Sequence, residues 1–106
     1  MKNILSLVFY VPESHLEAVK TAIFAAGAGK LGNYDCCCWQ TKGTGQFRPL
    51  PGSDPHIGAT GRLEKVDEWK VEVICEAKKI GAVVDAMKKA HPYETVAYLV
   101  LQPHEG

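Results

Sequence analysis

Apolar and polar positions in the first third of the chain follow two different periods. Residues 3–10 are apolar on both faces, as in the central strand of a sheet. After Pro12 the apolar positions recur every three or four residues, which predicts a helix with one apolar stripe that stops at Gly27. The stripe consists of Leu16, Val19, Ile23 and Ala26.

The rest of the chain repeats this order after a second strand predicted at residues 34–41. Residues 62–76 alternate strictly, with Val71, Val73 and Cys75 facing one way, which predicts a third strand. A second apolar stripe predicts a helix that ends near His91, because proline disfavours helical geometry in the residue before it. The stripe consists of Ile80, Val83, Val84 and Met87, and residues 95–101 form the last predicted strand.

The order strand, helix, strand, strand, helix, strand is that of the α+β, ferredoxin-like split βαβ sandwich (βαββαβ). We therefore expect a four-stranded antiparallel sheet with two helices on one face. Apolar side chains on the other face would need a cover that one copy of the chain lacks, so we expect subunits to associate there. The candidates for that face are Trp39, Val96 and Tyr98.

Residues 42–61 interrupt this pattern with five glycines and three prolines, which predicts a long loop or extended arm. Loops of this length in small domains are commonly functional or disordered. Arg48, with Gly43 and Gly45, has the residue types of an anion cradle, although the lysine-serine or lysine-threonine ending of a P-loop is absent. We interpret this segment as a recognition arm.

Length and composition indicate one globular domain, residues 1–106, with 46% hydrophobic and 23% charged residues. Twelve basic residues balance twelve acidic ones without a long run of like charge, which argues against nucleic-acid and anionic-membrane binding. The first apolar run is too short to span a bilayer and is followed by no small-residue cleavage site, so we expect a cytoplasmic protein.

The candidate chemistry lies in two places. His91 suits a metal ligand or a general base, and equally a histidine that donates to free carbonyls at a helix end. On a strand Cys36 and Cys38 would point to one face and could share a metal, although buried small hydrophobes are the simpler interpretation. No catalytic triad spacing, acidic pair or dinucleotide fingerprint is evident, so we expect no catalysis by the chain itself.

Three stretches, GNYDCC, GTGQFRP and HPYETVAY, together resemble the small CutA-like domain of YqfO-type proteins, here expected as a stand-alone version. HPYE (residues 91–94) is also similar to a motif of the CutA family, trimeric proteins linked to divalent-metal tolerance. The resemblance implies a homotrimer with His91 near a cleft between subunits, where CutA-like proteins hold copper. Thr95 follows HPYE where CutA proteins continue with proline and a further glutamate, so that carboxylate is missing.

We therefore expect a small binding or regulatory module that holds a small ligand or a divalent metal, zinc or copper, at subunit interfaces. The expected ligand-binding residues are His91, Tyr93, Glu94, Tyr34 and Arg48, and the expected metal ligands are His91, Glu94, Cys36 and Cys38. The alternatives are a metal-dependent enzyme and an accessory subunit of a separately encoded dimetal scaffold, since the resemblance implies that the dimetal ligands lie outside this domain.

Overall fold

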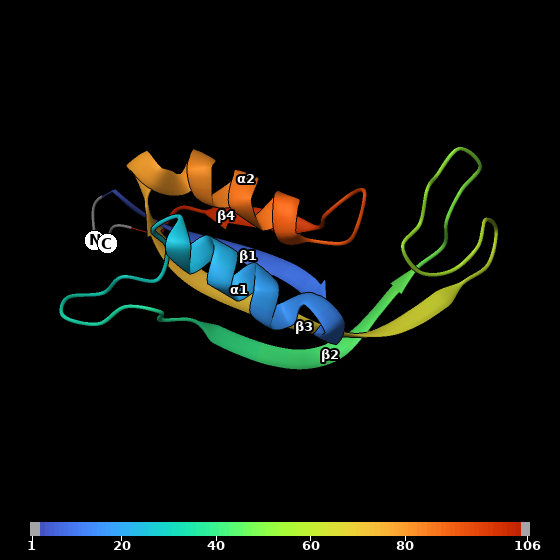
Figure 1. Ribbon diagram of the computed structural model, residues 1–106, viewed down its shortest axis with the longest axis horizontal. Helices are drawn as coiled ribbons and strands as arrows, with labels where there is room; N and C mark the ends of the chain where they lie inside the picture. Colours follow the sequence, from blue (N-terminus) through green and yellow to red (C-terminus); the bar gives the residue numbers. More distant parts are fainter. Residues whose placement is uncertain (1–2, 105–106) are drawn as a thin grey trace.

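The apolar run at the start of the chain forms strand β1 (Ile4–Pro12), an inner strand of a four-stranded sheet in the order β2-β3-β1-β4. Every neighbouring pair of strands is antiparallel in this computed structural model, which describes residues 3–104. The two α-helices lie on one face of the sheet (Figure 1). The predicted ferredoxin-like α+β sandwich is thus confirmed.

The elements follow one another with short connections, except before and after β2. Their order is β1, the 3₁₀ turn η1 (Glu13–His15), α1 (Leu16–Ala25), β2 (Trp39–Phe47), β3 (Glu64–Glu76), the 3₁₀ turn η2 (Ala77–Lys79), α2 (Ile80–Ala90) and β4 (Tyr98–Leu101). Among the described residues, no helix has the length and apolar character that a bilayer crossing needs.

The core lies between the sheet and the helices, and its members are the alternate residues of β1 and β3 together with the two predicted helix stripes. Phe9 opposes Val71 and Leu7 opposes Val73, and all four side chains are almost fully buried. From α1 and α2 the core receives Leu16, Val19, Ile23, Val83 and Met87. Burying this apolar surface is the main stabilising term of the sandwich.

The first helix begins later than the pattern predicts. Pro12 belongs to β1, and its extended backbone (φ −67°, ψ 153°) leads into η1 before α1 begins at Leu16. Proline fixes φ near −65°, which suits an extended residue as well as a first helical turn. The predicted stop is confirmed at Gly27, whose φ of +113° is costly for any residue with a Cβ.

The second strand is displaced toward the C-terminus from its predicted position at residues 34–41. Leu31 and Tyr34 exchange both backbone hydrogen bonds, which closes a tight turn, and Cys36 has a left-handed backbone (φ +54°). Cys36 and Cys38 therefore do not alternate on a strand, and that expectation was wrong. β2 instead runs through both glycines of the GTG stretch, because each of its nine residues pairs with β3.

The arm is therefore shorter than the predicted loop, and we define it as residues 48–63, between β2 and β3. The paired ends of β2 and β3 carry it beyond β1, whose pairing with β3 ends at Glu68. Figure 1 shows the arm projecting from one end of the sheet, which lengthens the molecule to 46 Å.

Of the three apolar residues predicted for the open face of the sheet, Trp39 lies there and the other two do not. Tyr98 opposes the buried Phe9, so it lies on the helix side, where the Lys88 ammonium is 4.9 Å from the centre of its ring. Val96 packs against the core as well, so both expectations were wrong. Directly opposed residues share a face, which places Trp39 beside Glu72 and Leu99 beside Val8 on the open side.

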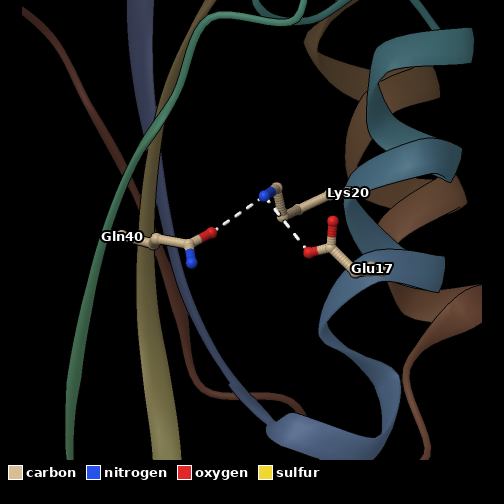
Figure 2. Close-up of polar contacts among 3 residues, drawn as sticks. All are labelled: Glu17, Lys20 and Gln40. Carbon is tan, nitrogen blue, oxygen red and sulfur yellow. Dashed lines mark hydrogen bonds and ion pairs between the residues drawn. The ribbon is translucent and has the colours of Figure 1, made fainter.

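One polar contact ties the edge strand to the helix layer. The Lys20 ammonium, on α1, donates to Gln40 Oε1 at 2.8 Å and lies 3.2 Å from Glu17 Oε2 (Figure 2). Gln40 opposes Val71 and so points to the helix side of the sheet. Since the Lys20 side chain is only 18% exposed, its bond to Gln40 helps to hold β2 against α1.

Candidate functional site

The HPYE turn and the arm meet at the same end of the sheet and enclose a cleft. Figure 1 shows the orange-red segment after α2 at the end from which the green and yellow arm projects. The cleft, which we call the arm cleft, has a volume of about 560 Å³. Its lining comes from β1, the β2–β3 ribbon, the arm and the HPYE turn, and includes Tyr10, Phe47, Arg48, His56, Glu68, Tyr93, Glu94 and Ala97.

His91 connects the HPYE turn to β1. The ring is 6% exposed, its Nε2 lies 2.6 Å from the Tyr10 carbonyl oxygen, and its Nδ1 accepts the Tyr93 backbone N–H at 3.2 Å. A carbonyl only accepts and a backbone N–H only donates, so the ring is neutral with its proton on Nε2. Burial lowers the pKa of His91, and the charges of His15 and His56 act in the same direction, while the bond to Tyr10 opposes them.

The expected metal donors do not form a centre within one chain. Both nitrogens of His91 are occupied, and Glu94 Oε2 accepts the Asp54 backbone N–H at 2.8 Å. The segment with Cys36 and Cys38 lies at the opposite end of the sheet (Figure 1). Among residues 3–104, no three histidine, cysteine or acidic side chains are grouped as a metal site. A site shared between copies of the chain stays a prediction.

The remaining residues that the sequence suggested as site residues also lie in different parts of the fold, and only Arg48 is at the arm cleft. Arg48 lines the arm cleft with Tyr93 and Glu94, as the prediction of a ligand site requires. Tyr34 is 75% exposed and lies in the tight turn with Leu31, and Figure 1 shows the segment before β2 at the end of the sheet away from the arm. Cys38 is half-buried against the core, whereas Cys75 is buried and its thiol has a raised pKa for that reason, so both pack as small hydrophobic residues.

Tyr93 and Glu68 form a hydrogen-bonded pair in the arm cleft. The Tyr93 hydroxyl donates to Glu68 Oε2 at 3.0 Å. Burial raises the pKa of Tyr93, and the hydrogen bond and negative charge of Glu68 raise it further, so the phenol keeps its proton at neutral pH. The other oxygen of Glu68 lies against Gly45, where a Cβ would overlap it. The glycine thus leaves space for the carboxylate.

Aromatic rings surround Tyr93 on several sides. Its ring centroid lies 4.8 Å from that of His91, 6.2 Å from that of His56 and 6.3 Å from that of Phe47. His56 also meets His15 edge to face at 5.6 Å, so the arm contacts both the HPYE turn and η1. The spacing of His15 and His56 along the chain gives no sign of this contact.

Comparisons with known proteins agree with part of the resemblance. No protein-family model matches the chain. A GTP cyclohydrolase 1 type 2 homolog of Mycobacterium leprae is 48% identical over 91 residues, which are 86% of this chain and 24% of that protein. The homolog from Halalkalibacterium halodurans is 45% identical over 97 residues, or 92% of this chain and 26% of that protein. The chain thus spans about a quarter of the length of these curated relatives.

The chain is also similar in structure to solved proteins of two kinds, a protein related to NIF3 and CutA proteins. A Bacillus cereus protein related to NIF3 matches with a TM-score of 0.80 and 42% identity over 92% of this chain and 25% of that one. CutA from Xylella fastidiosa matches with a TM-score of 0.71 and 15% identity over 99% of this chain and 88% of that one. The chain therefore has a CutA-like fold and is similar in sequence to a segment of longer proteins related to NIF3.

We predict that His91 makes folding sensitive to acid. Between the ordinary histidine pKa of about 6.5 and the lowered value in the fold, only the unfolded chain is protonated at this residue. The free energy of unfolding therefore falls as the pH falls through this window, by at most about 1.4 kcal/mol per pH unit for this one group. His91→Gln, whose amide still donates to Tyr10, should reduce the slope in urea unfolding.

His104→Gln is the matched control, since His104 is exposed near the C-terminus. Its slope should equal that of the unmodified chain. Equal slopes for His91→Gln and His104→Gln would contradict the assignment of a neutral, buried His91.

We also predict that Gly45→Ala separates Tyr93 from Glu68. The added Cβ displaces the end of a flexible side chain rather than backbone, so the fold should persist while the hydrogen bond is lost. The pKa of Tyr93 should then fall, although burial keeps it above its ordinary value. Alkaline titration of the tyrosine ring signals by NMR measures this. Gly43→Ala, where a Cβ meets open space, is the control, and equal Tyr93 titration in the two variants would refute the arrangement.

Proposed function

We propose that this domain is a binding module without catalysis of its own, and that it holds a small organic ligand in the arm cleft. The observation that carries the proposal is the cleft itself, whose lining combines segments that are far apart in the chain. Its volume lies in the range usual for small-molecule sites, about 300–1,000 Å³.

The polar groups around the cleft support binding rather than catalysis. His91 uses both ring nitrogens to hold the turn, and Glu94 holds the arm through Asp54. The Tyr93 phenol keeps its proton and donates to Glu68. Groups engaged in this way give a preorganised surface, which reduces the cost of ordering on binding.

A small organic ligand is favoured over a divalent cation for the same reason. A metal would have to displace the Tyr10 carbonyl or the Tyr93 N–H from His91, and each leaves a buried polar group unpaired. Aromatic rings and prolines form much of the remaining wall, which suits a planar or apolar ligand.

A variant that fills the cleft tests this proposal. Ala97 lines the cleft and is exposed, so Ala97→Phe should occupy the space without disturbing the core. We expect small aromatic fragments to shift backbone amide signals around the cleft in NMR spectra of the unmodified chain, and this response to disappear in the variant. Ala82→Phe, on the exposed side of α2, is the control. Fragments that bind equally well to Ala97→Phe, or not at all to the unmodified chain, would refute the proposal.

We further propose that the module works in an assembly, as a homotrimer, with the open face of the sheet as the association surface. That face carries Trp39 at 68% exposure on one edge strand, β2, and Leu99 at 54% and Leu101 at 48% exposure on the other edge strand, β4. Large apolar side chains gathered on one face are typical of association surfaces.

Sedimentation tests the assembly. The unmodified chain should sediment as a trimer at micromolar concentration, and Trp39→Glu should shift it toward monomer because a carboxylate is costly to bury. Ala82→Glu, on the helix side, should leave it unchanged. A monomeric unmodified chain would refute the homotrimer. A monomer that associates only with the remaining three quarters of a longer relative would favour the alternative of an accessory subunit.

A further inference from the structure

A second, smaller cleft of about 310 Å³ adjoins the arm cleft, and we call it the strand cleft. Its lining comes from β1, β2 and β3 and includes Tyr10, Thr41, Gly43, Gly45, Glu68 and Lys70. Tyr10 and Glu68 line the arm cleft as well. The two clefts therefore meet at these two side chains, and one molecule can reach into both.

Strand register places the floor of the strand cleft on the open face of the sheet. Glu68 and Lys70 alternate with the core residues of β3, so both point away from the helices. Lys70 opposes Tyr10 on β1 and Thr41 on β2, and in the next row Glu68 opposes Gly43. A Cβ added to Gly43 would meet no atom within 4 Å, so the space beside Glu68 stays open.

Glu68 and Lys70 carry opposite charges on the same face, yet within residues 3–104 they form no ion pair with each other. Glu68 accepts the Tyr93 hydroxyl at 3.0 Å. The Lys70 ammonium lies 3.4 Å from Oε1 of Glu72, on the side away from Glu68. Alternate Cα atoms of a strand are about 7 Å apart. A ligand that carries both charges therefore fits between the two side chains.

The groups around Lys70 suit a carboxylate. Thr41 Oγ1 accepts the indole N–H of Trp39 at 3.2 Å, which leaves its own hydroxyl proton free to donate. Thr41 directly opposes Lys70, and opposed side chains have their Cβ atoms about 5 Å apart. The ion pair of Lys70 with Glu72 is partly exposed on both sides, and exposed pairs contribute little, so a ligand can replace it.

Glu68 suits an ammonium group. A carboxylate has about four acceptor positions, and the Tyr93 hydroxyl occupies one of them. Glu68 is only partly exposed, and no cation of the described residues pairs with it. Partial burial of a charge without an opposite charge costs free energy, and a bound cation would offset that cost.

Beyond Glu68 the arm cleft has largely apolar walls. They include Phe47, Pro49, Leu50, Ile57 and Ala97. Leu50 is 61% exposed, so contact with an aliphatic group would remove apolar surface from water. The apolar part of a ligand that spans both clefts therefore belongs on the arm side of Glu68.

We propose that the two clefts together bind an apolar α-amino acid, with its ammonium group on Glu68, its carboxylate on Lys70 and Thr41, and its aliphatic side chain in the arm cleft. This inference rests on the proposed function of the arm cleft and names its ligand class. Each part of the ligand meets a different set of side chains, so each part can be removed separately.

Calorimetric titration of the unmodified chain tests the assignment with leucine and three analogues. Isoamylamine lacks the carboxylate of leucine, isocaproate lacks the ammonium group, and glycine lacks the side chain. We expect leucine to bind at least about tenfold more tightly than isoamylamine or isocaproate, because each loses hydrogen bonds between charged groups. Glycine should also bind more weakly. No binding of leucine, or equal affinity for any of the three analogues, would overturn the assignment.

Two variants test the two charged contacts. Glu68→Gln still accepts the Tyr93 hydroxyl through its amide oxygen, so leucine affinity should fall to that of isocaproate, and isocaproate affinity should not change. Lys70→Met should lower leucine affinity to that of isoamylamine and leave isoamylamine affinity unchanged. An equal loss for leucine and the analogue would indicate a structural effect and overturn that contact. Thermal unfolding of each variant checks that the fold is retained.

The matched controls lie near the end of β3 that is away from the arm. Glu76→Gln changes a carboxylate on the same strand and face as Glu68. Lys78→Met changes an exposed lysine that pairs with a glutamate, as Lys70 does. Both should keep the leucine affinity of the unmodified chain. A control that lowers it as much as the cleft variants do would contradict local contacts at Glu68 and Lys70.

Failure of this inference is distinguishable from failure of the proposed function. If aromatic fragments shift the cleft signals and Ala97→Phe abolishes that response, while leucine does not bind, the arm cleft is a ligand site and the ligand class is wrong. If leucine binds Ala97→Phe as tightly as the unmodified chain, the placement of its side chain is wrong. If neither fragments nor leucine bind, both proposals fall.

Discussion

The cleft depends on the hydrogen bonds of one buried imidazole. His91 ends the second helix and lies between the carbonyl of Tyr10 on β1 and the backbone N–H of Tyr93 in the following turn. A neutral ring is the form that satisfies both partners, and burial favours that form. This pair of bonds sets where the chain leaves α2, and therefore where the aromatic ring of Tyr93 stands relative to the sheet.

The other parts of the cleft are in contact with Tyr93 or with its neighbour Glu94. Tyr93 reaches Glu68 on β3, whose carboxylate fits beside β2 because Gly45 has no side chain. Glu94, one residue later, holds the arm through the backbone of Asp54, and His56 of the arm packs on Tyr93. The arm and the HPYE turn therefore line the cleft together and contact each other, so the shape of the cleft depends on the geometry of the turn.

The hydrogen bonds of the HPYE residues change how the motif is interpreted. The CutA-like fold by itself assigns no ligand, and His91 and Glu94 are both engaged with the backbone of their own chain. Tyr93 and Glu94 both line the cleft, and Tyr93 is bonded there to a side chain, Glu68, whereas Glu94 is bonded to the backbone of Asp54. The motif is best understood as the device that positions this tyrosine.

Periodicity along the chain was sufficient to predict the element order, both helices and the split βαβ topology, because helix and strand patterns depend on which local positions are buried. It misplaced β2, since glycines in GTGQ indicate a loop locally while pairing with β3 holds them in a strand. It also put Tyr98 on the wrong face, because a side chain's face depends on register with β1.

The residues of the candidate site also fall into two groups, those that the sequence could indicate and those that only the structure revealed. His91, Tyr93, Glu94 and Arg48 could be selected from their residue types and their motifs, and the structure brings the four to one end of the sheet. Glu68, Phe47 and His56 could not, because their importance comes from contacts with Tyr93 across 25 or more positions of the chain. The sequence alone determined the elements and the chemical groups available; tertiary packing decided which of them meet, because burial and hydrogen-bond partners exist only once distant strands are in register.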